Sequence, residues 1–387
     1  MDYSRILSST VQDIKPSGIR KFFDLLENMQ GVVALTVGQP DFITPWHIRV
    51  AAIESLENGK TYYTSNSGTL ELRQEISSYM NRRYDLTYDP KSEVIVTVGG
   101  SEAIDIAIRA LINPGDEVIV PQPAFVCYGP ICELAGGKPV YLNTKEENKF
   151  KLTAEELKSV IADKTKLLVL PYPNNPTGAI MTREDLEEIA DVLRGTDIMI
   201  LSDEIYCELT YGREHVSIAS LDGMRERTII ASGFSKTYAM TGWRLGYTLA
   251  PPEITKQMLK IHQYAIMCAP TTSQYAAVEA MRNGDPDVAM MRKEYNRRRR
   301  YIVGGLRSIG IECFDPEGAF YVYPNISKFG LTSEEFCERL LQEEKVAIVP
   351  GTAFGECGEG FARISYAYSV EHIAKALDRM ERFVKKL

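Results

Sequence analysis

Between about residues 90 and 250, short apolar runs alternate with segments whose apolar residues recur at helical spacing. The runs are rich in Val, Ile and Leu with few polar interruptions, which is typical of strands buried on both faces. Strands are expected at Glu93–Val98, Glu117–Val120, Pro139–Leu142, Lys166–Leu170, Ile198–Ser202, Thr228–Ala231 and Leu245–Leu249. Helices are expected at Glu102–Ile112, Arg183–Leu193 and Ile254–Met267. The alternation predicts an α/β domain with a mostly parallel seven-stranded sheet sandwiched by helices.

The pattern changes after about residue 285. A long charged helix is expected at Asp285–Ser308, followed by a compact α+β unit. Its expected elements are the apolar run Ala319–Tyr323, a helix near Ser333–Glu343, strands at Ala347–Pro350 and Phe361–Ala367, and a final helix from Val370. We therefore predict three parts along the chain: an N-terminal segment (residues 1–40), a large domain (41–285) and a small C-terminal domain (286–387). The N-terminal segment is expected to pack on the small domain.

Composition narrows the class of protein. A chain of 387 residues with 44% hydrophobic residues can bury a sizeable core. Its net charge of −8 argues against a nucleic-acid partner, and the basic run Arg297–Arg300 is interpreted as a solvated helix face. Seven cysteines without a C-x-x-C pair and four scattered histidines indicate neither a disulfide framework nor a metal site. With no apolar signal core and no long apolar run, we expect no membrane contact and a soluble, cytoplasmic protein.

The segment Ser232–Arg244 carries the strongest chemical signal. Lys236 lies just after the expected buried strand Thr228–Ala231, so its amine can be held out of bulk water. Burial lowers the pKa of a lysine and frees the amine as a nucleophile. Ser235 and Arg244 are suited to hold a phosphate beside it. The pattern suggests a Schiff-base lysine serving pyridoxal phosphate (PLP), although an isolated Ser-Lys pair is more often part of a solvated loop.

Two further segments join a strand end to polar residues. In Val98–Ile104, paired glycines precede a helix, and amides at a helix N-terminus bind anions. In Pro171–Gly178, the turn-rich sequence favours a tight loop. Its Asn175 follows the carboxyl end of a strand, where open α/β sheets place their ligands. The amide of Asn175 is suited to a ring hydroxyl or a substrate carboxylate.

Asp203 ends another expected strand, in the run Ile198–Tyr206. A carboxylate there needs a partner, because an unpaired buried charge is costly. A protonated pyridine nitrogen is such a partner, and Tyr206 is placed to donate to the cofactor's phenolic oxygen. Glu204 is expected to point the opposite way, since adjacent strand residues face opposite sides.

Arg363 lies in the apolar, β-rich run Gly360–Tyr366. A buried guanidinium needs an acidic partner and binds a carboxylate through two parallel hydrogen bonds. An internal salt bridge is the alternative to a substrate-binding role.

Together, these segments resemble the class I and II aminotransferases of PLP fold type I over essentially the whole chain. The positions that match the family's cofactor-binding residues are Gly100, Ser101, Phe125, Asn175, Asp203, Tyr206, Ser235, Lys236, Arg244 and Tyr63. Those that match its substrate-binding residues are Gly38, Asn175 and Arg363, and its catalytic residues are matched by Lys236, Asp203 and Tyr206. The resemblance implies that Phe125 stacks on the PLP ring. It also implies a homodimer in which Tyr63 reaches the phosphate of the neighbouring subunit.

Two positions depart from the family pattern. Gly233 stands where many relatives carry a hydroxyl three residues before the lysine, so the phosphate is expected to rely more on Ser235 and Arg244. Ser101 stands where aspartate-specific bacterial relatives carry a lysine, which argues against an aspartate preference.

The resemblance implies a ping-pong transfer of an amino group between an L-amino acid and a 2-oxo acid. We expect a broad or aromatic-leaning range with glutamate and 2-oxoglutarate as a common pair. An aromatic mouth is predicted from Phe125 and Tyr128, with Tyr62, Tyr63 and Tyr321 as further candidates. The alternatives are a lyase that eliminates sulfur groups on the same scaffold, or an aminotransferase of the aspartate or N-acetyl-diaminopimelate type.

Overall fold

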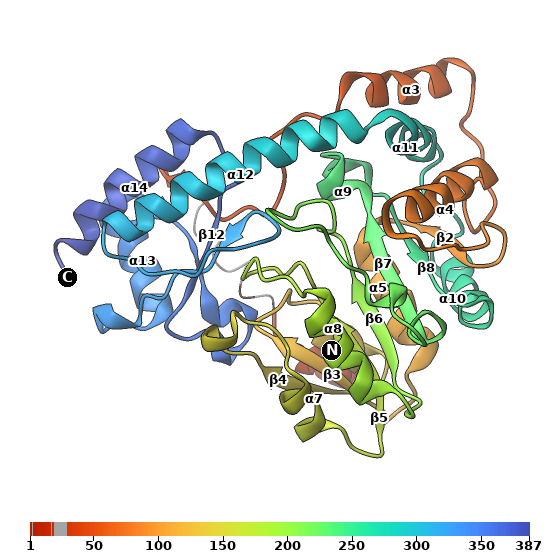
Figure 1. Ribbon diagram of the computed structural model, residues 1–387, viewed down its shortest axis with the longest axis horizontal. Coiled ribbons are helices and arrows are strands. Elements are labelled where there is room, and N and C mark those ends of the chain that lie inside the picture. Colours follow the sequence, from red (N-terminus) through yellow and green to blue (C-terminus); the bar gives the residue numbers. More distant parts are fainter. Residues whose placement is uncertain (2, 17, 19–28) are drawn as a thin grey trace.

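The computed structural model describes residues 1, 3–16, 18 and 29–387. A seven-stranded sheet forms its centre (Figure 1). In spatial order its strands are β2 (Val94–Thr97), β8 (Gly246–Leu249), β7 (Thr228–Gly233), β6 (Met199–Asp203), β5 (Thr165–Leu170), β3 (Glu117–Gln122) and β4 (Lys138–Asn143). Only β8 is antiparallel to its neighbours within this sheet. The mostly parallel sheet and all seven expected strands are confirmed.

Helices cover both faces of the sheet, as the continuous apolar strands predict. Alternate residues of β5 enter different cores. Leu167 and Val169 pack with helices α5 (Gly99–Leu111) and α10 (Pro252–Ala265), whereas Leu168 and Leu170 pack with helices α7 (Ala154–Val160) and α8 (Arg183–Leu193). The helices of this part are α3 (Trp46–Glu57), α4 (Leu70–Tyr84), α5 (Gly99–Leu111), α6 (Tyr128–Leu134), α7 (Ala154–Val160), α8 (Arg183–Leu193), α9 (Phe234–Thr237), α10 (Pro252–Ala265) and α11 (Thr271–Asn283). Helices α3 and α4 both pack on α11, beside the β2 edge.

Local sequence signals explain where several helices begin. Helices α7 and α8 start at capping boxes, in which Thr153 pairs with Glu156 and Thr182 pairs with Asp185. Each threonine accepts a hydrogen bond from a free amide of the first turn, while the acidic side chain accepts one from the cap residue's own amide. The helix expected at Arg183–Leu193 therefore has the same bounds in the structure.

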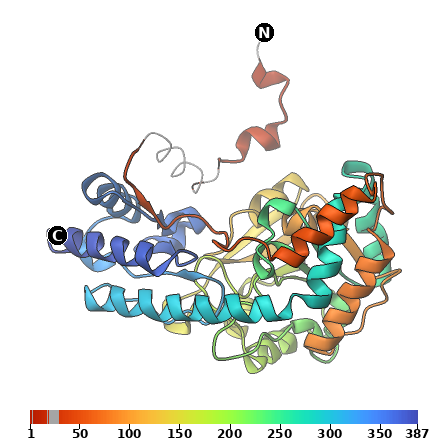
Figure 2. The same ribbon diagram turned by 90° about the horizontal axis from the view of Figure 1, so that it is seen from above.

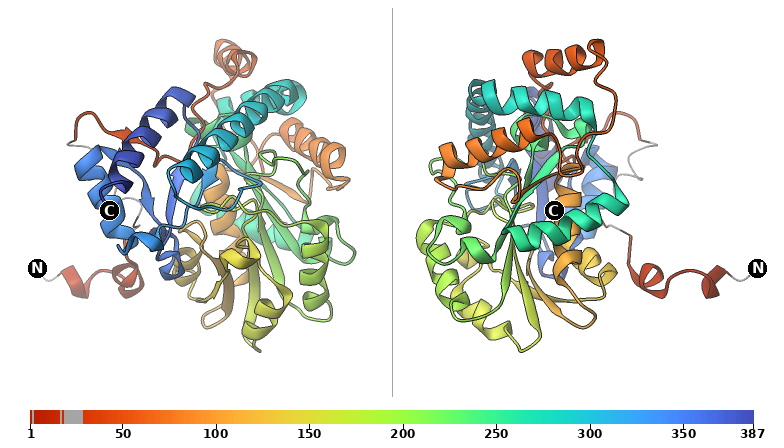
Figure 3. Two further views of the ribbon diagram at one scale, coloured as in Figure 1. Left: turned by 60° about the vertical axis from the view of Figure 1, so that its left-hand side comes forward. Right: turned by 90° about the vertical axis from the view of Figure 1, so that its right-hand side faces the viewer.

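The C-terminal segment forms a smaller body at one end of the molecule, drawn in blue in Figure 1 and Figure 3. Its elements are α12 (Asp285–Ser308), β9 (Tyr321–Val322), α13 (Ser333–Glu344), β10 (Val346–Ala347), β11 (Val349–Pro350), β12 (Ala362–Ser365) and α14 (Val370–Val384). Strands β11, β12 and β9 form an antiparallel sheet, and α12, α13 and α14 share one apolar core with it. Helix α12 has the bounds expected from the sequence.

The N-terminal part contacts both bodies. Strand β1 (Val33–Ala34) pairs in parallel with β10, while α1 (Ser9–Asp13) lies near α6. Figure 2 shows the first residues projecting from the rest of the chain. The boundaries at residues 40 and 285 remain a prediction. Among the helices of the described residues, none combines the length and the apolar character that crossing a bilayer requires.

Candidate active site

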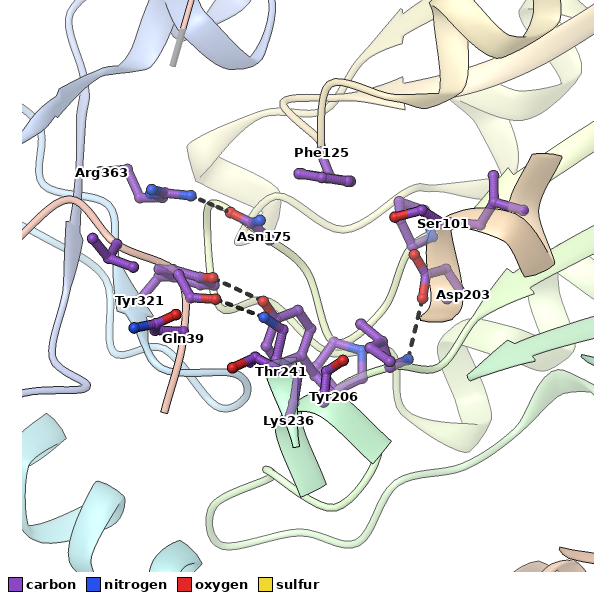
Figure 4. A pocket seen from close by; sticks show the side chains of 18 of the residues that line it. Gln39, Ser101, Phe125, Asn175, Asp203, Tyr206, Lys236, Thr241, Tyr321 and Arg363 are labelled. Carbon is purple, nitrogen blue, oxygen red and sulfur yellow. Dashed lines mark hydrogen bonds between the residues drawn. The ribbon is translucent and has the colours of Figure 1, made fainter. Parts of the chain in front are cut away.

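A cavity of about 390 Å³ opens at the carboxyl ends of the parallel strands, where the small body meets the sheet (Figure 4). Loops after β3, β5, β6 and β7 supply one side of it, and β12 with the segment around Gly38 supplies the other. Its lining includes Thr36, Gly38, Gln39, Gly100, Ser101, Phe125, Tyr128, Asn175, Asp203, Tyr206, Ser235, Lys236, Thr241, Arg244, Tyr321 and Arg363. This is the position at which open α/β sheets bind ligands.

The cavity brings together every residue of the sequence-predicted site except Tyr63. Tyr63 lies between α3 and α4, and 77% of its surface is exposed. Neighbouring Tyr62 is also exposed and lies outside the cavity lining. The contact of Tyr63 with a second subunit therefore remains a prediction.

Lys236 lies on the one-turn helix α9, immediately after β7. Its Nζ donates a 2.6 Å hydrogen bond to the carbonyl oxygen of Gly38. Burial lowers the pKa of Lys236 from its ordinary value of 10.5 to about 8, assisted by the charges of Arg363 and Arg244 and opposed by Asp203. About a tenth of this amine is therefore uncharged at pH 7, far more than for an ordinary lysine, and the uncharged form is the one that acts as a nucleophile or a base.

Asp203 is the last residue of β6 and faces the cavity. Its carboxylate accepts hydrogen bonds from the Tyr128 hydroxyl at 2.7 Å and the Ile205 amide at 3.1 Å. Burial raises the pKa of Asp203, while these two donors oppose the rise. A cation or a protonated nitrogen in the cavity would stabilise its charged form.

Glu204 points away from the cavity, as expected from its place next to Asp203. Its carboxylate accepts hydrogen bonds from Ser202 at 2.8 Å and Ser217 at 2.6 Å, and lies 3.0 Å from His215 Nε2. Of these two adjacent carboxylates, only Asp203 can meet a ligand.

One end of the cavity is suited to a phosphate. Helix α5 begins there with Gly99, Gly100 and Ser101, and the guanidinium of Arg244 lies over the first glycine. Gly99 has a φ of +77°, a conformation that favours glycine, and a Cβ atom there would lie 2.8 Å from Arg244 Nη2 and displace the guanidinium. Ser235 adds a buried hydroxyl from the β7 side. Amides, hydroxyls and a guanidinium together form an anion site.

Arg363 lies at the opposite end, on β12, and is 3% exposed. Its Nη1 donates to Asn175 Oδ1 at 3.0 Å and its Nη2 donates to the Thr36 carbonyl oxygen. The rings of Tyr321 and Phe354 flank it at 4.7 and 4.8 Å. It makes no ion pair with any described residue, and its Nε has no partner there. The alternative of an internal salt bridge is therefore wrong, and this buried cation is available to a carboxylate.

Tyr128 and Tyr321 have positions that the sequence did not predict. Both are 1% exposed and hold other site residues: Tyr128 binds Asp203, and the Tyr321 hydroxyl lies 2.8 Å from that of Tyr206. Phe125, Tyr128 and Tyr321 all line the cavity, and their role as an aromatic mouth for the substrate remains a prediction. Tyr128 could have been found as a buried polar group near an unpaired carboxylate, but Tyr321 carries no such signal.

Comparison with known proteins decides the family. The sequence profile described as aminotransferase class I and II matches residues 30–380. The chain belongs to this family. It is 54% identical over 380 residues to the putative aminotransferase YugH of Bacillus subtilis, with 98% of both chains covered. It is 46% identical over 381 residues to the probable N-acetyl-LL-diaminopimelate aminotransferase of Bacillus subtilis, with 98% of this chain and 96% of the relative covered.

Solved structures agree with this assignment. The aromatic aminotransferase of Pyrococcus horikoshii superposes with a TM-score of 0.90 at 46% identity, covering 94% of this chain and 99% of that one. This aminotransferase therefore has PLP fold type I and depends on PLP, the cofactor of its family. The cavity fits that cofactor: it offers an anion site at one end and a buried carboxylate, Asp203, that lacks a cationic hydrogen-bond partner among the described residues.

Proposed function

We propose that Lys236 is the residue that binds PLP covalently and later moves the substrate proton. The observation that carries the proposal is its environment: a partly buried amine with a pKa lowered to about 8, placed between two guanidinium groups. An uncharged amine attacks an aldehyde carbon, and the same amine, once released, accepts a proton from the substrate Cα. Bound PLP supplies an electron sink that makes this Cα–H bond acidic.

The cavity divides the remaining roles among its ends. Arg244, Ser235, Ser101 and Gly100 would hold the phosphate, and Asp203 would keep the pyridine nitrogen protonated. Asn175 and Tyr206 would donate to the ring oxygen, and Phe125 would stack on the ring. Gly38 and Arg363 would hold the substrate carboxylate. Tyr128 supports this arrangement by fixing one oxygen of Asp203, which leaves the carboxylate oriented toward the cavity.

The charges of the cavity bear on the substrate. Its cationic side chains among the described residues are Lys236, Arg244 and Arg363, and the roles above employ all three. No further cation is left there for a distal carboxylate, and Ser101 stands at the position of the lysine in aspartate-specific relatives. We therefore propose a broad or aromatic-leaning substrate range, with glutamate and 2-oxoglutarate accepted through neutral hydrogen-bond donors. A preference for aspartate or an N-acetylated diamino acid is the alternative.

A half-reaction panel tests the substrate range. The PLP enzyme is mixed with phenylalanine, tyrosine, glutamate, aspartate or an N-acetylated diamino acid, and conversion of the cofactor to its amine form is followed by absorbance. We expect kcat/KM for the aromatic amino acids to equal or exceed that for aspartate. An aspartate preference of about a hundredfold, about 2.7 kcal/mol in transition-state binding, would contradict the proposal.

Covalent labelling tests the role of Lys236 independently of the substrate. Borohydride reduction of the PLP enzyme, followed by peptide mapping, is expected to place the label on Lys236. The Lys236→Ala variant should bind PLP without becoming labelled, because the anion site is unchanged. Label on another lysine in the wild-type enzyme would disprove the assignment.

We further propose a homodimer with two active sites, each completed by Tyr63 of the partner subunit. Ile43 and Trp46 at the start of α3 and Tyr62 and Tyr63 after its end are all exposed large hydrophobic residues, which supports a partner contact around this helix. Light scattering should give twice the mass of the 43.4 kDa chain. A fully active monomer would contradict this proposal. The cytoplasmic location expected from the sequence remains a prediction.

A further inference from the structure

A buried pair, His262 and Glu102, lies directly behind the anion site and has no role in the chemistry above. Glu102 lies in the first turn of α5, one residue after Ser101, and His262 lies near the end of α10, which packs on α5. His262 is 0% exposed, and its Nδ1 lies 2.5 Å from Glu102 Oε1. The pair therefore joins a second helix to the residues that begin the anion site.

Glu102 replaces the missing cap of α5. The cap residue, Val98, has an apolar side chain and makes no side-chain cap hydrogen bond. Its own amide instead donates to Glu102 Oε2. The first amides of a helix have no partner within the helix, and an acidic side chain in the first turn can satisfy one of them. Glu102 thus fixes the turn from strand β2 into α5.

This bond leaves the following amides available to a ligand. Within the described part of the chain, the amides of Gly99, Gly100 and Ser101 make no hydrogen bond, and Gly100 and Ser101 line the cavity. A phosphate needs these groups aimed at it, and a mobile turn would have to be ordered on binding. The contact between Glu102 and Val98 supplies that order beforehand.

His262 controls where the Glu102 carboxylate points. With Val98 on one oxygen and His262 on the other, both oxygens of Glu102 are engaged. Without His262 only the Val98 amide would hold this carboxylate, so a negative charge next to the anion site would be less firmly fixed in place. His262 Nε2 is buried without a partner among the described residues, so the contact with Glu102 is the polar interaction that offsets burial of the imidazole.

We propose that His262 and Glu102 are positioning residues that hold the Val98–Ser101 turn open for the phosphate of PLP. The inference rests on the proposed placement of the phosphate at this turn. It assigns no chemical step to either residue: they act through the backbone amides and set the affinity for the phosphate group.

Comparing PLP with pyridoxal, which lacks the phosphate, isolates this effect. In the full-length protein, Glu102→Ala should raise the Kd of PLP about 10- to 100-fold, as expected when a buried amide loses its partner and a bound anion loses oriented donors. The Kd of pyridoxal should change less than about threefold. Glu102→Gln keeps an acceptor oxygen for the Val98 amide and should restore most of the PLP affinity. His262→Leu should raise the Kd of PLP about fivefold or more, again without changing that of pyridoxal.

The ³¹P chemical shift of bound PLP provides a readout that a purely structural role would not move. It should change in Glu102→Ala and His262→Leu and stay near the wild-type value in Glu102→Gln. Asp105→Ala is the matched control, because Asp105 lies on the same helix and pairs with Arg109 at the surface. This control should leave both dissociation constants and the ³¹P shift unchanged.

The outcomes separate this inference from the proposed function. Equal loss of PLP and pyridoxal affinity, or unchanged affinity for both in Glu102→Ala and His262→Leu, would overturn the positioning role. If Glu102→Ala does not fold, the dissociation constants of PLP and pyridoxal are compared in His262→Leu and Glu102→Gln instead. Wild-type protein that binds PLP and pyridoxal equally would show that the phosphate is placed wrongly. Borohydride labelling away from Lys236 would refute the proposed lysine while leaving the phosphate comparison valid.

Discussion

Replacing Lys236 by methionine should stabilise the cofactor-free protein at neutral pH. In the unfolded chain this lysine has its ordinary pKa of 10.5, whereas in the folded chain burial lowers the pKa to about 8. Each tenfold change in a protonation equilibrium is worth about 1.4 kcal/mol, so keeping Lys236 in the fold costs about 3 kcal/mol at pH 7. Methionine has a similar length and carries no charge to desolvate.

The variant also loses an interaction, which reduces the gain. Lys236 Nζ donates to the Gly38 carbonyl oxygen at 2.6 Å, and such a bond from a charged donor contributes about 1.5 to 3 kcal/mol. We therefore expect Lys236→Met to raise the free energy of unfolding by up to about 2 kcal/mol at pH 7.

The sign of the effect should depend on pH. Between pH 8 and pH 10.5 the unfolded chain holds a proton on Lys236 that the folded chain has released. The wild type therefore gains stability as the pH rises through this range, and the variant does not. The higher free energy of unfolding of Lys236→Met, relative to the wild type, should be fully present below pH 8 and should disappear before pH 10.5.

Urea unfolding of the cofactor-free proteins at several pH values measures this directly. Lys375→Met, at an exposed position on α14, is the control for replacing a lysine by methionine and should show no such crossover. A constant difference between Lys236→Met and the wild type across the range would refute the reasoning. So would a variant that is less stable than the wild type at pH 7.

Three further predictions concern catalysis and assembly. Asp203→Ala should lower kcat about a hundredfold or more, because a charge aimed at the reacting system is lost. Glu204→Ala should affect mainly stability, and a loss of kcat in this variant but not in Asp203→Ala would show that the wrong carboxylate was assigned. Arg363→Met should raise KM for every amino acid about a hundredfold, since all share the α-carboxylate, and an effect on only some substrates would contradict this role. Tyr63→Phe should weaken PLP binding about tenfold in equilibrium titration, whereas unchanged affinity would argue against the cross-subunit phosphate contact.

The strands and most helices could be predicted because their periodicity is local. Three of the seven core strands, β2, β7 and β8, are buried along their whole length, and β5 is buried over its last four residues, so these strands appear in the sequence as mostly apolar runs. The start of α8 was visible in Thr182 and Asp185, which form its capping box. By contrast, the reversed direction of β8 depends on how the chain returns to the sheet, and no local pattern records it.

The site was predictable where one residue carries its own signal. Lys236 and Asp203 are ionisable residues at the ends of buried strands. Burying the charged form of such a side chain costs free energy, so an ionisable residue at this place indicates a functional site. The role of Tyr321 could not be predicted, because it depends on a strand far along the chain reaching Tyr206. The His262–Glu102 contact was missed for the same reason: its two residues come from helices 160 positions apart.

The bond from Lys236 to Gly38 has a consequence for the chain without its cofactor. Lys236 follows β7 of the large sheet, whereas Gly38 follows β1, which pairs with the small body. Arg363 makes the same kind of connection in the other direction, from β12 to Asn175. The groups assigned to the ligands therefore also connect the two bodies when no ligand is bound. A covalent ligand on Lys236 would replace its bond to Gly38, so the occupancy of the site and the rigidity of the joint between the bodies are coupled.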